Sequence, residues 1–598
     1  MNERIERLRG EMGKLGIDAY VVADADPHSS EYPAPHWKTR SWLSGFTGSN
    51  GTLVVTPGAE SHGEARLWTD GRYYIQAEGQ LAGSGVTLMR GGEPGVPDYI
   101  EWLADISKGK KWKIGVDGKT TSCSAYDALN KALAGENIIV TGHDLISQIW
   151  ADGRPDVPAG KIFCHDIKYA GKHASVKIDE VRAALRGKGA DCALIAGLED
   201  VAWLYNIRGS DMPLLPVVYA CAFVSPDSAE LYIDREKTDD GVVSYLAGQG
   251  IHVRAPGDLQ TRLEGLKTGG RICCDPKKTS VELRRYIPDG VEVVYAAEPT
   301  IMLKAIKNEA EIRGHREAQI WDGAAMARFM IWIEKKAESG EAFTEWDASK
   351  ELTRLRALSP ESRGDSFNTI AGYGPNGAMM HYGPSESKSA LIKNAGFMVV
   401  DSGGQYPGGT TDVTRTIVFG RTTPEERSDY TLTLKSHIAL ASARFLYGAA
   451  GSHIDSIARK VMWDHGLDYK CGTGHGIGCY LSVHEGPQSV SMRTQGGERL
   501  EPDMIISIEP GVYREGKHGV RIENLVRITD DFTNEFGRFL HFETLTFVPI
   551  CLEGVEKDML DGGEREWLNA YHRDVYEKIS PLLDGYERAW LKNATRAI

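Results

Sequence analysis

Apolar and polar positions at the start of the chain follow a helical repeat. Apolar side chains recur every three or four positions in residues 4–15 (Ile5, Leu8, Met12 and Leu15), which predicts an amphipathic helix. The apolar run Ala19-Tyr-Val-Val follows and predicts a buried strand. A helix–strand unit therefore opens the protein.

The same pattern returns near residue 176. Val176, Val181 and Leu185 fall on one face of a predicted helix, and the apolar strand Cys192-Ala-Leu-Ile comes next. The agreement continues downstream, because RSWLSGFTGS precedes a predicted strand at Gly51 and VAWLYNIRGS precedes one at 217–224. We predict two related α/β domains in tandem, joined by a polar, proline-containing linker at 151–160.

The pattern changes beyond Pro299, where a long charged segment places Ile312, Ile320 and Ala324 on one helical face. A third domain of nearly 300 residues is expected from there. Its end carries aromatic and leucine side chains at helical spacing, which predicts a helical appendage. The expected domains are 1–155, 156–306 and 307–598, the last with a helical extension from about residue 545.

Composition limits the classes of partner. The 598 residues carry 69 Lys and Arg against 83 Asp and Glu, a net charge of −14 that repels nucleic acid. The longest apolar run, 214–224, is about half a membrane-spanning helix, and the N-terminus has no apolar stretch typical of a signal peptide. Nine scattered cysteines favour reduced thiols. We expect a cytoplasmic protein without a nucleic-acid or membrane partner.

Candidate chemistry first appears at two aspartates in the third domain. The apolar segment FMVV ends at Asp401, a Pro-Gly-Gly turn follows, and Asp412 begins a threonine-rich strand, so a hairpin would bring both carboxylates to one end. Two like charges beside apolar strands carry a desolvation cost that a divalent cation would relieve. Asp401 alone would also suit an Asx-turn.

A second acidic pair lies downstream. Glu509 ends the apolar run Met504–Ile508, and the alternation of Val520 to Glu523 puts Arg521 and Glu523 on the same face of a strand. An internal ion pair between Arg521 and Glu523 would explain those two residues when they are considered alone.

His475 lies between these pairs, among glycines at 472, 474, 476 and 478 that leave room for a close approach to the ring. A lone histidine is more often a core residue. Four carboxylates and one imidazole together form a hard ligand set that favours Mn²⁺ and can hold two ions. His381 and His484 are candidates for hydrogen bonding or proton transfer beside the metals, although either could be structural.

At these residues the chain resembles the pita-bread metallopeptidases, and over its whole length it resembles their three-domain cytosolic type, the Xaa-Pro aminopeptidases (aminopeptidase P). The similarity rests on DSGGQYPGGTTDVTRT, GTGHGIG, VHEGP, SIEPG and GVRIEN, and on SGFTGSNGT, LWTDGRYY and WLYNIRGSD nearer the N-terminus. The resemblance implies two tandem creatinase-N-terminal-like α/β domains followed by a pita-bread catalytic domain. It also implies hydrolysis of the N-terminal Xaa-Pro bond through a metal-bridging hydroxide, and a homodimer.

The resemblance further assigns roles to individual residues. Asp412 and Glu523 would bridge two Mn²⁺ ions, Asp401 would bind one, and His475 with Glu509 would bind the other. Glu509 would also relay a proton, and His381 and His484 would stabilise the gem-diolate or orient the substrate. Arg521 and Tyr513 would brace the site, and Arg72, within TDGRYY, would reach the cleft from the N-terminal domain.

The sequence departs from the family at Cys471, where a second histidine usually lines the proline side of the site. A thiol is a weak hydrogen-bond partner and cannot become a cation as imidazole can. We therefore expect Cys471 to contact substrate and to alter turnover or pH dependence.

Two alternatives remain at this point. A prolidase would cleave only Xaa-Pro dipeptides, but such proteins usually have one N-terminal domain rather than two. A non-catalytic pita-bread scaffold would have lost metal ligands, whereas all five positions carry a ligand here.

Overall fold

The computed structural model describes residues 3–23, 25–57, 64–133, 135, 137–492 and 497–598. The chain forms two compact units. The N-terminal unit contains 1–165 and 172–301, and the C-terminal unit contains 166–171 and 302–598. The three-domain boundaries expected at residues 155 and 306 stay a prediction.

The first half of the N-terminal unit is built on a six-stranded sheet with the order β4-β3-β2-β1-β5-β6. The strands are β1 (Ala19–Ala23), β2 (Thr52–Val55), β3 (Ala65–Thr69), β4 (Thr87–Arg90), β5 (Lys113–Gly115) and β6 (Ile138–Val140). The helices are α1 (Glu3–Leu15), α2 (Thr39–Ser44), α3 (Tyr74–Leu81), α4 (Tyr99–Ser107), α5 (Cys123–Ala132) and α6 (Leu145–Ile149). Ile5, Leu8 and Met12 of α1 are buried, as the helical repeat predicts, but Leu15 in the last turn is exposed, so the buried face of the helix ends at Met12.

The second half has a sheet of the same topology, with the order β12-β11-β10-β8-β13-β14. Its strands are β8 (Cys192–Ile195), β10 (Cys221–Val224), β11 (Ala229–Tyr232), β12 (Ile251–Arg254), β13 (Arg271–Cys274) and β14 (Glu292–Tyr295). Its helices are α8 (Ala174–Lys188), α9 (Leu198–Tyr205), α10 (Asp240–Gly248), α11 (Asp258–Glu264) and α12 (Val281–Arg285). In both sheets the central strand pairs antiparallel with one neighbour and parallel with the other, which confirms the tandem repeat.

Two details of the repeat differ from the sequence prediction. The strand expected at 217–224 is confined to β10, because the Asp211 amide bonds to the Val217 carbonyl and the Tyr219 amide bonds to the Asp211 carboxylate. These local bonds replace sheet pairing. Val176 is 46% exposed, so the buried face of α8 runs instead through Ile178, Val181 and Leu185.

The C-terminal unit holds a three-stranded sheet, β15-β16-β19, and a six-stranded sheet, β20-β27-β26-β23-β21-β22. The first contains β15 (Ile370–Tyr373), β16 (Ala395–Ser402) and β19 (Val413–Gly420). The second contains β20 (Phe445–Leu446), β21 (Gly474–Gly476), β22 (Glu485–Val490), β23 (Ile505–Ile508), β26 (Asn524–Asn534) and β27 (Gly537–Thr544). Each sheet has a short hairpin in one of its connections: β17 (Gln405–Tyr406) with β18 (Gly409–Thr410) between β16 and β19, and β24 (Gly511–Arg514) with β25 (His518–Arg521) between β23 and β26.

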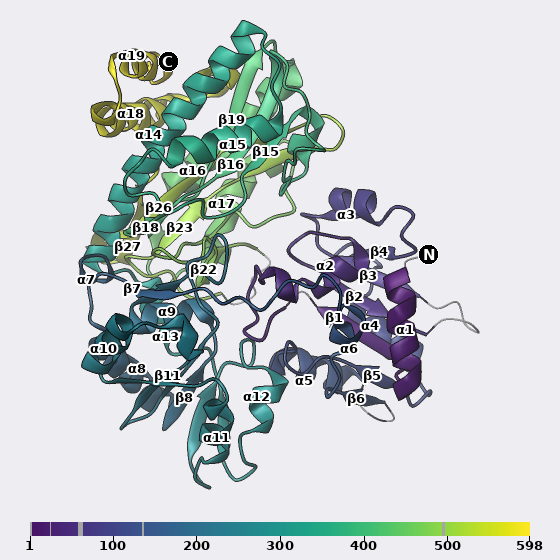
Figure 1. Ribbon diagram of the computed structural model, residues 1–598. Helices are drawn as coiled ribbons and strands as arrows, with labels where there is room; N and C mark the ends of the chain where they lie inside the picture. The colour runs from purple at the N-terminus through teal and green to yellow at the C-terminus, as the bar shows by residue number, and fades with distance from the viewer. Residues whose placement is uncertain (1–2, 24, 58–63, 134, 136, 493–496) are drawn as a thin grey trace. The chain divides into compact units, whose positions relative to one another are not determined.

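The long helix expected after Pro299 is α14 (Glu309–Ser339), which begins at an Asn308 capping box. It packs against α15 (Glu345–Arg356) and against the C-terminal helices α18 (Gly562–Ile579) and α19 (Gly585–Ala594), drawn in yellow in Figure 1. Helices α16 (Pro424–Ala441) and α17 (Gly451–Trp463) pack on each other, and α7 (Ile167–Ala170) contacts α14. The short helix α13 (Thr300–Ala305) crosses the boundary between the units.

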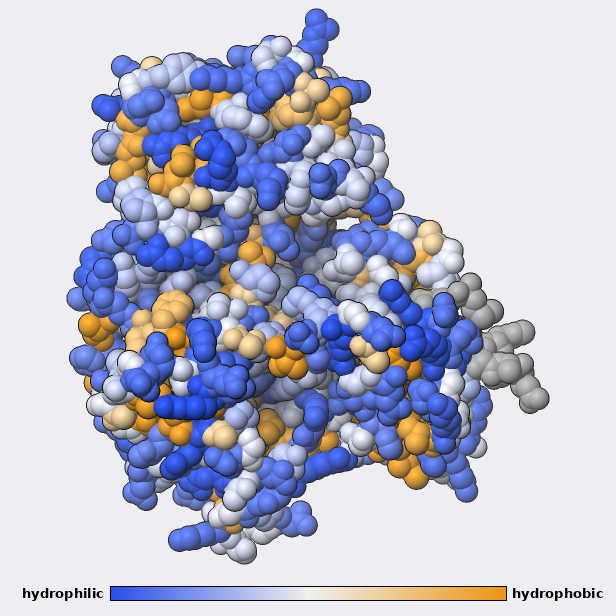
Figure 2. Space-filling view, viewed as in Figure 1, coloured by the Kyte–Doolittle hydropathy of each residue, from blue (hydrophilic) through white to orange (hydrophobic). Residues whose placement is uncertain are grey.

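The surface in Figure 2 is mainly hydrophilic, with smaller apolar patches between the charged residues. Within the described ranges, no helix is long and apolar enough to cross a membrane. All nine cysteines lie in those ranges and none of them forms a disulfide, which agrees with the expectation from their number and spacing.

Candidate metal centre

The two aspartates predicted from the sequence lie at one end of the three-stranded sheet. Asp401 belongs to β16, and Asp412 directly precedes β19. The strands pair antiparallel, with Asp401 opposite Thr414 and Ser402 opposite Val413. The chain between them forms the β17–β18 hairpin, so the expected hairpin is present with a second, smaller one at its tip.

The other three candidate ligands come from the six-stranded sheet. His475 lies in β21, Glu509 directly follows β23, and Glu523 directly precedes β26. Strands β23 and β26 are adjacent, with Ile508 opposite Asn524, so the two glutamates leave the sheet side by side. The structure thus brings all five residues from two sheets to a common region.

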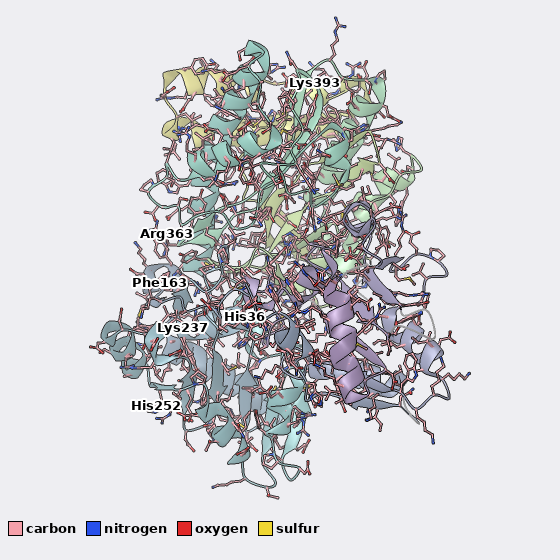
Figure 3. The ribbon with its side chains drawn as sticks, turned by 45° about the vertical axis from the view of Figure 1, so that its right-hand side comes forward. His36, Phe163, Lys237, His252, Arg363 and Lys393 are labelled. Carbon is pink, nitrogen blue, oxygen red and sulfur yellow. The ribbon has the colours of Figure 1, made fainter. Side chains whose placement is uncertain are left out.

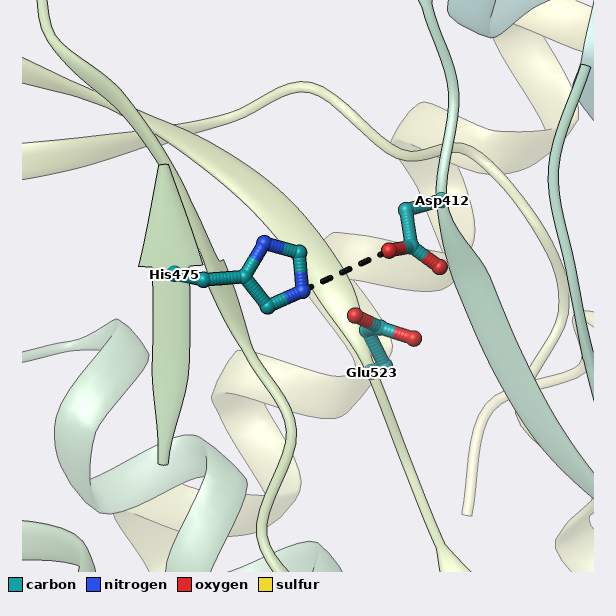
Figure 4. Close-up of side chains that lie close together, drawn as sticks. All are labelled: Asp412, His475 and Glu523. Carbon is teal, nitrogen blue, oxygen red and sulfur yellow. Dashed lines mark ion pairs between the residues drawn. The ribbon is translucent and has the colours of Figure 1, made fainter. Parts of the chain in front are cut away.

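Three of these residues already have the spacing of a cation site. The ligand atoms of Asp412, His475 and Glu523 lie within 4.8 Å of one another (Figure 4). His475 Nε2 lies 3.5 Å from Asp412 Oδ2 and 3.3 Å from Glu509 Oε1. One imidazole therefore faces two carboxylates.

Burial makes this arrangement costly without a cation. Asp401 is 7% exposed, Asp412 4% and Glu523 1%. Each has a buried oxygen that accepts no hydrogen bond from any described residue: Oδ1 of Asp401, Oδ1 of Asp412 and Oε1 of Glu523. Buried carboxylate oxygens are normally paired or coordinate metals. The donor set, mostly oxygen with one imidazole, fits divalent ions such as Mn²⁺.

The pKa values of these carboxyl groups point the same way. Burial, together with the charges of neighbouring carboxylates, raises the pKa of Asp412 and of Glu523 well above the usual range. Burial opposes ionisation of Glu509 as well, but the hydrogen bond and charge of His475 outweigh it and lower that pKa to about 2. The same pairing overcomes the burial of His475 and raises its pKa to about 9. The region carries more acid than its own cations can neutralise.

Arg521 and Tyr513 hold one side of the centre. The Arg521 guanidinium donates to Asp401 Oδ2 at 2.6 Å and to the Tyr513 hydroxyl at 2.7 Å. The ion pair expected between Arg521 and Glu523 is therefore made with Asp401 instead. Thr414 connects the two groups, because its hydroxyl accepts from Arg521 Nε at 3.1 Å and donates to Glu523 Oε2 at 2.7 Å.

Sequence reasoning missed two hydroxyls that orient the ligands. Thr414 fixes Glu523, and the Ser507 hydroxyl accepts from the His475 amide at 3.0 Å and donates to Glu509 Oε1 at 3.2 Å. The signal was available, since Thr414 lies two residues after Asp412 and Ser507 two before Glu509, on the same strand faces.

The glycines on either side of His475 have a packing role. A Cβ on Gly474 would lie 1.9 Å from the Ser507 carbonyl oxygen, and one on Gly476 would lie 2.1 Å from the Glu485 carbonyl oxygen. Any side chain there would push apart the strands that carry the ligands.

The two candidate histidines enter from separate segments. The ring of His484 lies edge-on to His475 with centroids 4.3 Å apart. The next residue, Glu485, is buried and pairs with Lys304 at 3.1 Å and with Lys307. Neither lysine was singled out from the sequence, and their distance along the chain from Glu485 leaves no local signal. His381 follows Met380, whose carbonyl accepts from Arg521 Nη2 at 3.3 Å.

Cys471 and Arg72 have different surroundings. Cys471 is half-buried and packs, with Tyr513, against the small apolar cluster of Leu432, Met462, Tyr469 and Val512. Arg72 belongs to the N-terminal unit, where it bonds both oxygens of Asp70 and lines a cavity of about 380 Å³. Its expected contribution to the catalytic cleft stays a prediction.

Family comparison identifies the class of protein that this fold and site define. Residues 313–530 match metallopeptidase family M24, and 538–598 match the C-terminal region of that peptidase. Residues 4–149 and 153–311 each match a creatinase/prolidase N-terminal domain, in agreement with the repeat of the two sheets.

Proteins that are similar over the whole of this chain identify the branch of the family. The chain is 38% identical to "Aminopeptidase P2" of Arabidopsis thaliana, covering 99% of this chain and 88% of that protein. It is 37% identical to a "Probable Xaa-Pro aminopeptidase P" of Tuber melanosporum, covering 100% and 99%. The crystal structure of a Caenorhabditis elegans X-prolyl aminopeptidase, described as a cytosolic enzyme with a di-nuclear active site, superposes with a TM-score of 0.94 at 33% identity, covering 100% and 99%. The chain therefore belongs to the M24 metallopeptidases, in their aminopeptidase P branch.

Proposed function

We propose that this protein is a metalloaminopeptidase that removes the first residue from peptides with proline in the second position. The observation that carries the proposal is the set of three buried, unsatisfied carboxylate oxygens on Asp401, Asp412 and Glu523, beside His475. Relatives named "Probable Xaa-Pro aminopeptidase P", which match over nearly their whole length, support the substrate class.

We further propose that the centre holds two Mn²⁺ ions. Asp412 and Glu523 would contact both ions, Asp401 one, and His475 with Glu509 the other. Two such ions, when bound, lower the pKa of a water and polarise the scissile carbonyl. The di-nuclear active site named for the Caenorhabditis elegans enzyme supports the number of ions, and the oxygen-rich donor set supports the choice of metal.

The chain's own groups would position and protonate the substrate. Glu509 Oε1 would pass a proton to the leaving proline nitrogen, which has no N–H while it is part of the peptide bond. His381 and His484 would donate hydrogen bonds to the carbonyl oxygen as it gains negative charge. Arg521, braced by Tyr513, would hold Asp401 in place, and Cys471 would line the proline side.

The proposal also covers the compartment, the oligomeric state and the role of Arg72. We place the enzyme in the cytoplasm as a homodimer. Nine cysteines without a disulfide, and the description of the Caenorhabditis elegans protein as a cytosolic enzyme, support the compartment. The Arg72 side chain would approach the peptide from the N-terminal domain.

Mass-spectrometric product analysis with Mn²⁺ tests the activity. The substrates are Xaa-Pro dipeptides, longer peptides beginning Xaa-Pro, and matched longer peptides with alanine in place of proline. Release of only the first residue from the longer proline peptides is expected. Cleavage of dipeptides alone would indicate a prolidase, and absence of both hydrolysis and bound metal would indicate a binding scaffold.

A further inference from the structure

Glu345, the first residue of α15, is fully buried, and its carboxylate organises a single segment of chain, residues 373–390. We call this the His381 segment. Four groups donate to the carboxylate: the amide of Tyr373 at 2.7 Å, the side-chain amide of Asn376 at 3.0 Å, the hydroxyl of Tyr382 at 2.8 Å and the amide of Ala390 at 2.7 Å. One carboxylate thus fixes both ends of the segment and its middle.

His381 lies in a turn of this segment, between two residues that are held from outside it. The turn is closed by the Tyr382 amide, which donates to the Met379 carbonyl at 3.0 Å. On one side of His381, the Met380 carbonyl accepts from Arg521, the residue that also binds Asp401. On the other side, Tyr382 reaches Glu345.

We propose that Glu345 and Tyr382 are positioning residues that hold His381 beside the metal centre. The inference rests on the proposed function, in which His381 donates a hydrogen bond to the reacting carbonyl oxygen. A donor aimed at developing charge is effective only when its position is set before the reaction. Arg521 fixes one neighbour of His381, and the Glu345–Tyr382 bond fixes the other.

The chemistry of the bond suits this role. Burial and the Glu345 carboxylate raise the pKa of the Tyr382 hydroxyl, so the group stays protonated and remains a donor. Its other acceptor is the Lys388 carbonyl at 2.9 Å, which belongs to the same segment and cannot anchor it to the helix. Among the described residues, the hydrogen bond to Glu345 is the one that ties the Tyr382 hydroxyl to a separate element, α15.

Tyr382→Phe removes this bond and keeps the ring. Tyr373→Phe is the matched control, because the Tyr373 hydroxyl does not bond to Glu345. It donates to the Ala395 carbonyl at 2.6 Å and lies 3.4 Å from the carbonyl oxygen of Lys393, a residue labelled in Figure 3. On a longer Xaa-Pro peptide with Mn²⁺, Tyr382→Phe should lower kcat about tenfold and leave KM within about twofold, as expected for a lost hydrogen bond to a charged group. Tyr373→Phe should match the wild type.

A double-mutant cycle separates positioning from general stability. If Tyr382 acts through His381, adding Tyr382→Phe to His381→Ala should cause no further loss of kcat. The same tenfold loss in both backgrounds would overturn the proposal, as would wild-type kcat in the single Tyr382→Phe variant.

Hydrogen–deuterium exchange supplies a readout that does not depend on catalysis. Tyr382→Phe should speed exchange in residues 379–383 of the full-length, Mn²⁺-loaded protein, and Tyr373→Phe should not. Unchanged exchange would overturn the positioning role even if the protein proved to have another activity. A third outcome separates the two proposals. If Tyr382→Phe exchanges faster but the wild-type protein cleaves no Xaa-Pro peptide, the proposed function is refuted, and Glu345 and Tyr382 remain the anchor of His381.

Discussion

Glu345 and Glu523 are both buried glutamates of the C-terminal unit, yet their surroundings are opposite. Glu345 is 0% exposed and accepts hydrogen bonds from four groups of one segment. Glu523 is 1% exposed, faces other carboxylates and has one oxygen that accepts from no described residue. The first carboxylate is satisfied by the fold itself.

The difference shows how the hydrogen-bond donors around a buried carboxylate distinguish a structural role from metal binding. A carboxylate that stabilises structure brings its own donors, because an unmet acceptor costs about 1–3 kcal/mol. A carboxylate reserved for a cation keeps at least one oxygen without a donor and destabilises the protein until the ion is bound. By this criterion Asp401 and Asp412 belong with Glu523.

The largest expected effect follows from removing a ligand. Glu523→Gln should lower kcat/KM on an Xaa-Pro peptide by at least about 10³-fold, because an amide cannot serve as a bridging anion. Circular dichroism should show an unchanged fold. An active variant would show that Glu523, like Glu345, has a structural role and is not an essential metal ligand.

Acid should destabilise the C-terminal unit through His437. Its Nδ1 lies 3.1 Å from the Ile508 carbonyl oxygen, and burial with the charge of Arg415 lowers its pKa to about 3. The unfolded chain therefore takes up a proton that the folded chain refuses. The part of the stability that depends on neutral His437 is complete above about pH 6.5 and falls by about 1.4 kcal/mol per pH unit as pH drops toward 3.

Urea unfolding between pH 6.5 and 5 measures this slope. His437→Gln should be less stable at pH 7 but should lose this part of the pH dependence. An unchanged slope would show that His437 is not the group that takes up the proton.

Bound Mn²⁺ should raise the free energy of unfolding by about 2.7 kcal/mol at a hundred times its Kd. Differential scanning calorimetry with and without a chelator measures the corresponding rise in Tm. Asp412→Asn should remove most of the rise, and Glu345→Gln should keep it. An equal Mn²⁺-dependent rise in Tm in the two variants would contradict the distinction between metal-binding and structural carboxylates.

The same substitution should have opposite effects at the two glutamates in metal-free protein. Glu345→Gln should lower the free energy of unfolding by about 2 kcal/mol, because donors lose a charged acceptor. Glu523→Gln should raise the free energy of unfolding by about 1 kcal/mol. Because the pKa of Glu523 is raised in the folded protein, its ionisation at neutral pH costs stability, and this cost grows as pH rises. Denaturant unfolding in chelator at pH 7 compares them, and shifts of the same sign would contradict the account.

The smallest effect concerns Cys471, which packs with Tyr513 in the apolar cluster described above. Cys471→His should keep activity within about threefold of the wild type or raise it, since imidazole offers a stronger hydrogen-bond partner than a thiol. Steady-state kinetics on one peptide measures it. A large loss would show that the thiol is itself required.

Sequence reasoning reached the two α/β domains and their repeat because both follow from local periodicity, whereas the pita-bread catalytic domain was implied only by the resemblance to that family. It reached Asp401 and Glu509 as candidates because an acid at the end of an apolar strand is anomalous in any short window, and it reached Asp412 because the predicted hairpin would bring that carboxylate beside Asp401. It missed Glu345 and the Lys304–Glu485 pair, because their partners lie about 30 to 180 residues away and nothing local marks them. It also extended the strand at 217–224 too far, because the hydrophobic pattern does not show the local bond that the Tyr219 amide donates to the Asp211 carboxylate.

Calorimetric titration of the chelator-treated protein with Mn²⁺ tests the central claim most directly. The wild type and Glu345→Gln should each bind two ions per chain, and Glu523→Gln should bind at most one. Two ions bound with wild-type affinity by Glu523→Gln, or none bound by the wild type, would contradict the account.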